Sequence, residues 1–247
     1  MSTLIVTGAS RGIGAAVARL AAARGFAIAV NYARDREGAE RVAGEIVAAG
    51  GRAVALEADV SREADVVRLF ERAEAELGSL GALVNNAGIT GGSARVEDLT
   101  ASALEATLAV NVTGAFLCAR EAVRRLARSH GGPGGVIVNL GSLAARIGGG
   151  GEWVHYAASK AAVETMTRGL AIEVGREGIR VNAVSPGLID TDIHATSSLP
   201  DRLARMAPTV PMGRAGTAGE VAEAVVWLLS PAASYVTGAI LEVGGGR

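Results

Sequence analysis

The stretch Leu4-Ile5-Val6-Thr7-Gly8-Ala9-Ser10-Arg11-Gly12-Ile13-Gly14 decides the fold. Its first residues predict a strand that enters a glycine-rich turn, and the following Ala15-Ala16-Val17-Ala18 predicts a helix. Glycines let the backbone turn tightly and approach an anion, whose charge the helix N-terminus favours. The glycine spacing is Gly-x-x-x-Gly-x-Gly rather than Gly-x-Gly-x-x-Gly. Between a strand and a helix, this turn predicts a site for the pyrophosphate of a nucleotide.

Short β-branched runs alternate with longer helical stretches along the rest of the chain. This alternation is typical of an α/β fold, with a parallel sheet covered by helices on both faces. The predicted strands are residues 3–7, 27–31, 53–57, 82–86, 135–140, 179–184 and 238–242. The predicted helices are residues 12–24, 37–49, 62–77, 101–129 with an irregularity, 154–175 and 217–229.

The domain organisation follows from the same alternation. No linker or composition shift separates the two halves, so one domain over residues 1–247 is expected. Residues 188–212 are long for a connection and contain a weak helical centre at Pro200 to Met206. Such an excursion is often a lid over a site, although a disordered loop is the alternative.

Composition excludes several classes of protein. The 24 Lys and Arg nearly balance the 25 Asp and Glu, and no long basic run appears, so no nucleic-acid partner is expected. The single cysteine, Cys118, cannot form an internal disulfide and is expected to be a small buried hydrophobe. No signal pattern and no uninterrupted apolar run of about 18 residues is present. We therefore expect a soluble cytoplasmic protein without membrane association or a metal site.

The motif Tyr156-Ala-Ala-Ser-Lys160 places a phenol and an ammonium on one face of a helix. Bringing a tyrosine pKa from ~10 to about 7 requires roughly 4 kcal/mol of preference for the phenolate. A unit charge ~5 Å away supplies about 3 kcal/mol at an effective dielectric constant near 20. The pair thus predicts an acid or base that works near neutral pH, although an isolated Tyr-x-x-x-Lys also fits an exposed helical pair.

The end of the second predicted strand bears on the choice of nucleotide. An acidic residue there would suit the ribose hydroxyls of NAD, but the sequence is Asn31-Tyr32-Ala33-Arg34. Arg34 and Arg11 are both candidates to hold a 2'-phosphate, which favours NADP over NAD. Arg34 is alternatively an ordinary solvated charge diluted by Asp35.

Further polar residues follow the third and fourth predicted strands. Asp59-Val60 offers a carboxylate to an adenine amino group, although Asp59 or Ser61 is alternatively a helix N-cap. Asn85-Asn86-Ala87-Gly88 places turn-forming amides at the carboxyl edge of the sheet, where doubly wound folds bind ligands.

These motifs together resemble the short-chain dehydrogenase/reductase family of the single-domain type, over essentially the whole chain. The matching features are Thr-Gly-x-x-x-Gly-x-Gly at 7–14, Asn-Asn-Ala-Gly at 85–88, Asn111, Ser142, Tyr-x-x-x-Lys at 156–160, and Pro-Gly at 186–187 followed by Thr191. Two departures are Gly141, where the family often has a second serine, and Gly244 to Gly246, which lack a preceding acid. Within the family, the chain looks like the branch of 3-oxoacyl-carrier-protein reductases and glucose dehydrogenase-like proteins.

The resemblance implies a doubly wound, Rossmann-like sheet of seven parallel strands. It also implies NAD(P)-dependent hydride transfer to or from a small-molecule carbonyl or alcohol, and a homotetramer or homodimer. On this basis Ser142 and Tyr156 hold the substrate oxygen and Tyr156 gives or takes its proton. Lys160 lowers the phenol pKa and binds the nicotinamide ribose, and Asn111 supports a water relay to Lys160.

The same resemblance supplies the expected cofactor contacts. These are Gly8, Ser10, Arg11, Gly12, Ile13, Gly14, Asn31, Tyr32, Arg34, Asp59, Val60, Asn86, Ala87, Gly88, Tyr156, Lys160, Pro186, Gly187, Leu188 and Thr191. Thr191 and the Leu188 backbone would hold the carboxamide.

The substrate wall is less defined by sequence. Its candidates are Leu143, Arg146, Trp153, Ile189 and His194. Trp153 is the best single candidate, although a ring that caps the core fits equally. His155 is expected to be solvated or packed rather than a second catalytic acid.

The sequence is also compatible with other functions. A 3-oxoacyl-carrier-protein reductase and a sugar dehydrogenase are alternatives within the family, and a non-catalytic nucleotide-sensing protein is one outside it. The apolar arc of residues 157–174 is wider than one sheet face needs, which predicts packing against a second subunit.

Overall fold

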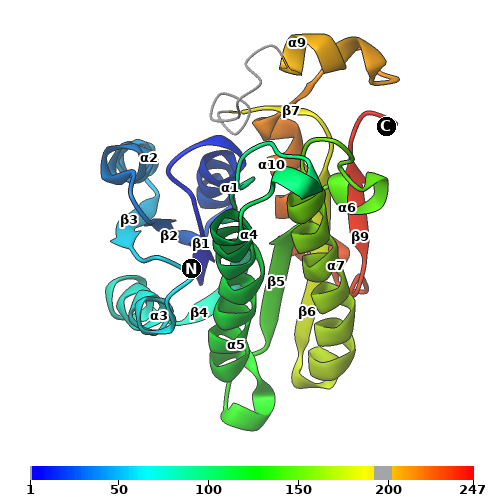
Figure 1. Cartoon of the computed structure of the whole chain (residues 1–247). Helices are drawn as coiled ribbons and strands as arrows, with labels where there is room; N and C mark the ends of the chain where they lie inside the picture. Colours follow the sequence, from blue (N-terminus) through cyan, green and yellow to red (C-terminus); the bar gives the residue numbers. More distant parts are fainter. Residues whose placement is uncertain (1, 192–201) are drawn as a thin grey trace.

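The computed structural model describes residues 2–191 and 202–247 (Figure 1). Its main sheet has seven parallel strands in the order β3-β2-β1-β4-β5-β6-β9. These strands are β1 Thr3–Val6, β2 Ala27–Tyr32, β3 Arg52–Glu57, β4 Leu80–Asn85, β5 Gly135–Leu140, β6 Ile179–Pro186 and β9 Ile240–Val243. Two short strands, β7 Ile189–Asp190 and β8 Gly216–Thr217, pair separately. The doubly wound parallel sheet predicted from the sequence is confirmed.

Helices cover both faces of this sheet (Figure 1). The α-helices are α1 Gly12–Ala23, α2 Arg36–Ala48, α3 Glu63–Leu77, α4 Ala101–Leu108, α5 Gly114–Leu126, α6 Ala144–Ile147, α7 Val154–Val174, α9 Arg202–Met206 and α10 Ala218–Leu229. Apolar residues of α1, α2 and α10 form one core cluster, and those of α3, α5 and α7 form another. In β1, Leu4 and Val6 join the first cluster and Ile5 the second, all fully buried. Burial on both faces explains the uninterrupted apolar sequence of this strand.

The predicted helix 101–129 is interrupted where the sequence indicated an irregularity. A π-helical turn, Ala109–Thr113, separates α4 from α5, and the helix ends at Leu126. The last strand begins two residues later than expected. Gly238 adopts a φ of +75° and donates its N–H to Val181, so that a turn occupies the predicted start of β9.

By length and composition, the stretch Ala101–Leu126 is also apolar enough to cross a membrane. Its inner side belongs to the fold, because Cys118 and Ala122 pack in the second core cluster with no exposed surface. Burial raises the pKa of the Cys118 thiol to about 12, as expected of a small buried hydrophobe. Its outer side exposes Leu104, Leu108 and Phe116.

The predicted lid, residues 188–212, is described only in part. It begins with β7 and ends with α9 and a short helical turn, Ala207–Thr209, whereas residues 192–201 lie outside the described residues. Arg205 in α9 forms an ion pair of 3.3 Å with Glu152, which precedes α7. The lid assignment remains a prediction.

Candidate active site

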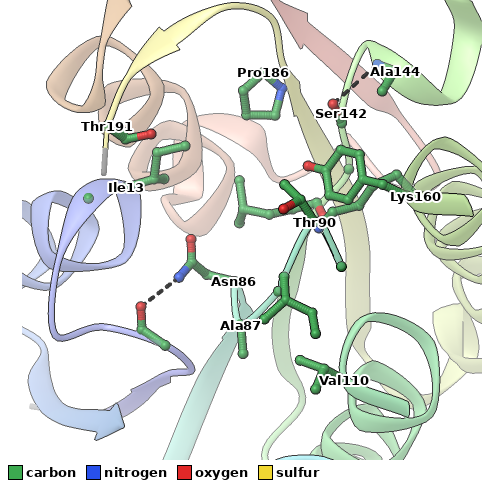
Figure 2. Close-up of a pocket in the computed structure, with 18 of the residues that line it drawn as sticks. Ile13, Asn86, Ala87, Thr90, Val110, Ser142, Ala144, Lys160, Pro186 and Thr191 are labelled. Atoms are coloured by element: carbon green, nitrogen blue, oxygen red, sulfur yellow. Dashed lines mark hydrogen bonds between the residues drawn. The ribbon is translucent and has the colours of Figure 1, made fainter. Parts of the chain in front are cut away.

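The carboxyl ends of the central strands border a cavity of about 690 Å³. The cavity runs from the glycine turn after β1 and the end of β2 to the start of α7. Figure 2 shows residues from several of these segments facing a common space. The sheet order reverses between β1 and β4, so this is the edge where ligands of open α/β sheets bind.

The glycine turn leaves the N-terminus of α1 free to receive an anion. Gly8 and Gly12 adopt φ angles of +61° and +57°, which L side chains rarely reach. No side chain caps α1, and its first turn has no acidic residue. By contrast, Asp35 caps α2 and Thr217 caps α10. Free amides and an uncompensated dipole fit a pyrophosphate, so the residues present suit a dinucleotide cofactor.

Hydrogen bonds tie this turn to the end of β4 (Figure 2). The Asn86 side-chain amide donates to the carbonyls of Thr7 and Gly8 at 2.8 and 2.9 Å. The Thr7 hydroxyl accepts from the backbone N–H groups of Asn86 and Ala87 at 2.9 and 3.0 Å. A Cβ on Gly8 would lie 2.9 Å from the Ala87 Cα. The two loops therefore form one rigid wall of the cavity.

The end of the cavity beside β2 carries two arginines without ion-pair partners among the described residues, together with the carboxylates of Asp35 and Asp59. Arg11 and Arg34 line the cavity, and neither forms an ion pair within residues 2–191 and 202–247. Neighbouring Arg36 is engaged instead with Glu57 at 2.8 Å and Glu40 at 3.6 Å. The nearby Asp35 carboxylate accepts the Gly38 N–H and so compensates its own helix. Arg11 and Arg34 are therefore available to an anionic ligand at this end of the cavity.

Asp59 and Asn31 have local partners at the same end. The Asp59 carboxylate accepts from the backbone and hydroxyl of Ser61, while α3 begins later at Glu63, so Asp59 does not cap that helix. Asn31 accepts from the Gly8 N–H and donates to the carbonyls of Leu56 and Ala58. Its side chain thus fixes the glycine turn, and both residues line the cavity.

Tyr156, Lys160 and Ser142 meet at the other end. Helix α7 carries the first two, and the Lys160 Nζ lies 5.8 Å from the centroid of the Tyr156 ring. The Lys160 Nζ donates to the Leu140 carbonyl at 2.7 Å, at the end of β5. Ser142 follows β5, and its hydroxyl accepts the Ala144 N–H at 3.1 Å (Figure 2). The predicted acid or base, its cation and a hydroxyl therefore border one cavity.

Burial perturbs the lysine strongly. Lys160 is 5% exposed, and desolvation lowers its pKa to about 8 despite the opposing effect of the Glu164 carboxylate. A pKa near 8 still leaves the ammonium protonated at neutral pH. The positive charge that a phenolate requires is thus present, in a place with little water to screen it.

Asn111 lies behind the cavity rather than in its lining. Its side-chain oxygen accepts the Ile89 N–H at 2.8 Å, and its amide donates to the Ile89 carbonyl and the Ser159 hydroxyl, both at 2.9 Å. Asn111 stands in the π-helical turn, a kind of turn that is frequent at functional sites. Its side chain holds the loop after β4, and the water relay remains a prediction.

The substrate-wall candidates separate into two groups. Leu143, Trp153 and Ile189 line the cavity, and Trp153 meets Tyr156 edge-on with centroids 6.2 Å apart. Arg146 does not line it. The Arg146 guanidinium instead forms an ion pair with the Glu242 carboxylate, with Nε 3.1 Å from Oε1, and its Nη2 donates to the Arg247 carbonyl at 2.7 Å. His194 lies outside the described residues.

The cofactor candidates all line the cavity except Gly14. A Cβ at Gly14 would lie 2.5 Å from both the Asn86 amide nitrogen and the Gly8 carbonyl oxygen. This glycine is needed for packing beneath the turn. Sequence reasoning missed Thr90 and the contact that holds it, although Thr90 stands two residues after the motif at 85–88 and lines the cavity.

Comparison with known proteins gives the family. A family model described as "Enoyl-(Acyl carrier protein) reductase" matches residues 8–247. An uncharacterized oxidoreductase of Escherichia coli, YgfF, is 50% identical over 247 residues and covers both chains fully. The chain belongs to the short-chain dehydrogenase/reductase family. It is therefore an oxidoreductase by descent, as its motifs predicted.

Solved structures of similar proteins contain nicotinamide cofactors. A short-chain dehydrogenase from Burkholderia cenocepacia in complex with NADP has a TM-score of 0.90 and 37% identity, covering 99% of this chain and 97% of that one. A 3-ketoacyl-(acyl-carrier-protein) reductase from Brucella melitensis complexed with NADH has a TM-score of 0.91 and 35% identity, covering 100% and 98%. A nicotinamide cofactor is common to these relatives, and the choice between the two forms differs among them.

The lowered pKa of Lys160 predicts a pH-dependent stability. Lysine ordinarily titrates at 10.5, so between about pH 8 and that value the unfolded chain binds more protons than the folded protein. The unfolding free energy of the wild type should therefore rise with pH relative to Lys160→Met. The expected gain is on the order of 3 kcal/mol across this window. Urea denaturation of both proteins near pH 7.5 and near pH 10 measures it, and a pH-independent difference contradicts the shift.

Proposed function

We propose that this enzyme transfers a hydride between NADP and a carbonyl or secondary alcohol, with Tyr156 as the general acid and base. The observation that carries the proposal is the buried Lys160 ammonium beside the Tyr156 ring, in the same cavity as Ser142. An unscreened cation next to a phenol favours the phenolate, which makes proton transfer feasible near neutral pH.

The roles of the residues follow from this arrangement. A bound nicotinamide supplies the hydride for reduction. The Ser142 hydroxyl donates a hydrogen bond to the substrate oxygen, and Tyr156 gives that oxygen its proton as negative charge develops. The Lys160 charge stabilises the phenolate that remains and binds the nicotinamide ribose. Asn111 supports a water relay that returns the proton through Lys160.

The preference for NADP rests on Arg11 and Arg34. Both arginines line the end of the cavity beside β2 and form no ion pair in the described part of the chain. A 2'-phosphate gives both of them a charge-assisted partner. Thr191 and the Leu188 backbone, at the opposite wall, hold the carboxamide.

The substrate is a small carbonyl compound with an apolar body. Leu143, Trp153 and Ile189 present apolar surface beside Tyr156, which suits a ketone or an acyl chain better than a sugar. A 3-oxoacyl substrate therefore ranks above a sugar. A role as a nucleotide sensor without chemistry ranks last, because such a protein has no need of the complete Ser142, Tyr156 and Lys160 set.

A second copy of the chain is the proposed partner. Helices α4, α5 and α7 leave apolar side chains at the surface, among them Leu108, Phe116 at 53% exposed and Ile172 at 86% exposed. Burial of such a face between subunits fits a cytoplasmic homotetramer or homodimer. Residues 1–247 act in it as one domain, with residues 188–212 as the lid.

The acid–base role of Tyr156 predicts a selective defect. Tyr156→Phe should lower kcat by at least about 100-fold, because general acid–base catalysis of this kind contributes that much or more. Binding of NADPH, followed by its fluorescence, should persist. The assay is NADPH consumption with a panel of ketones, oxo esters, acyl thioesters, quinones, steroids and sugars. Full residual activity of the variant would exclude the assigned acid.

The cofactor preference predicts the effect of removing either arginine. Arg34→Ala and Arg11→Ala should each lower the ratio of kcat/KM for NADPH over NADH by roughly 10- to 100-fold, the range of a charge-assisted hydrogen bond. Arg36→Ala is the matched control, because Arg36 already pairs with Glu57 and Glu40 and should leave the ratio unchanged. An unchanged ratio in Arg34→Ala and Arg11→Ala would refute this assignment.

The proposed assembly predicts the behaviour of a charged surface variant. Light scattering at micromolar concentration should find a dimer or tetramer for the wild type. Phe116→Asp should shift the protein toward monomers, because a carboxylate would be desolvated in the contact. Circular dichroism of the variant reports whether it folds. A monomeric wild type would rule out the assembly.

A further inference from the structure

The loop after β4 carries a polar side chain that the proposed chemistry does not use. This loop passes from Gly88 to Gly91 along the cavity. Asn111 fixes Ile89 through both its backbone N–H and its carbonyl. The next residue, Thr90, also lines the cavity, and Figure 2 draws it among the residues of that lining.

A buried histidine fixes Thr90 from behind. The His155 Nε2 lies 2.8 Å from the Thr90 carbonyl oxygen, to which it donates, and the ring is only 4% exposed. A Cβ on Gly91 would lie 3.0 Å from the same Nε2 and would also collide with the Thr107 hydroxyl. The backbone of Thr90 is thus held between α4 and α7. His155 immediately precedes Tyr156, so the same helix sets the position of both residues.

The Thr90 hydroxyl itself has no hydrogen-bond partner among the residues that the structure describes. The residue is 8% exposed, and its hydroxyl oxygen is not one of the fully buried side-chain atoms, so it is accessible from the cavity that the residue lines. A hydroxyl in a cavity wall without a protein partner relies on water for its hydrogen bonds, and a ligand oxygen can take the place of that water. The hydroxyl can therefore form a hydrogen bond with an oxygen of a substrate bound in the cavity. A hydroxyl both donates and accepts, so that a substrate hydroxyl, ketone or ester carbonyl suits it.

We infer that Thr90 is a specificity-determining residue whose hydroxyl binds a second oxygen of the substrate, distinct from the reacting carbonyl. His155 is a positioning residue that holds this hydroxyl in place. The inference rests on the proposed function, since it concerns the substrate of the same site. It assigns the substrate to oxygenated ketones, such as hydroxyketones and oxo esters, in preference to plain ketones of the same shape.

Binding without turnover tests the inference apart from the chemistry. The probes are hydroxycyclohexanones substituted next to the carbonyl and one and two carbons further away, each paired with the methylcyclohexanone of the same substitution. Ligand-observed NMR with the Tyr156→Phe protein and NADPH gives the affinity of each. At least one hydroxy compound should bind roughly tenfold more tightly than its methyl counterpart, the range of one hydrogen bond. Equal affinity, or no binding of the hydroxy compounds, overturns the inference.

Substitutions then assign the preference to Thr90. In the same Tyr156→Phe background, Thr90→Val replaces the hydroxyl by a methyl group of similar size and should abolish the preference. Thr90→Ser retains the hydroxyl and should retain the preference. A preference that survives Thr90→Val overturns the assignment, and it would show that the Thr90 hydroxyl is satisfied by water alone.

The role of His155 is tested by rescue in the otherwise wild-type enzyme. His155→Leu should raise KM for the preferred hydroxyketone several-fold more than KM for its methyl counterpart, whereas a merely structural defect would change both alike. His155→Gln has an amide nitrogen that can replace Nε2, so it should restore the lower KM of the wild type for the hydroxyketone. Failure of the wild type to oxidise NADPH with any ketone would count against the proposed function, while the binding preference in Tyr156→Phe would still report on Thr90.

Discussion

The cross-link between the ends of β1 and β4 is the constraint on which the rest of the site depends. Thr7 and Asn86 exchange hydrogen bonds across the point where the sheet order reverses, and Gly8 lets the two backbones approach. The glycine turn after β1 and the loop that bears Thr90 are therefore held together by hydrogen bonds. A parallel sheet brings the carboxyl ends of its strands to one edge, but these side-chain hydrogen bonds fix the positions of the two loops relative to each other.

The burial of Lys160 lowers the stability of the folded protein. An ammonium removed from water is unfavourable, and Lys160 has the Leu140 carbonyl as its hydrogen-bond partner in the described structure. The same lack of solvent makes its charge effective on the neighbouring phenol. Burial of this ammonium thus lowers the stability of the fold, whereas the apolar clusters on both faces of the sheet raise it. In the proposed function, the same burial favours proton transfer by Tyr156.

Sequence reasoning predicted the sheet and most helices because periodicity and glycine turns are local signals, whereas most of the predicted cavity lining came from the resemblance to the family. It placed Arg146 in the substrate wall because Arg146 follows Ser142 closely, but its direction depends on Glu242, nearly a hundred residues away. Gly14 was interpreted as a cofactor contact, whereas contact with Asn86 requires it. The link from His155 to Thr90 joins α7 to a loop far upstream, so that no local pattern could reveal it.

The π-helical turn at Ala109–Thr113 has a consequence for how this chain can change in evolution. A wide turn stores one extra residue, so loss of a residue there can return the segment to regular α-helical bonding with both flanking helices in place. Loss of a residue within α5 would instead rotate Cys118 and Ala122 by about 100° away from the sheet. A deletion in the turn that carries Asn111 would thus disturb the fold little. The length of this turn would then be maintained by selection for the position of the loop that Asn111 holds, and not by selection for folding.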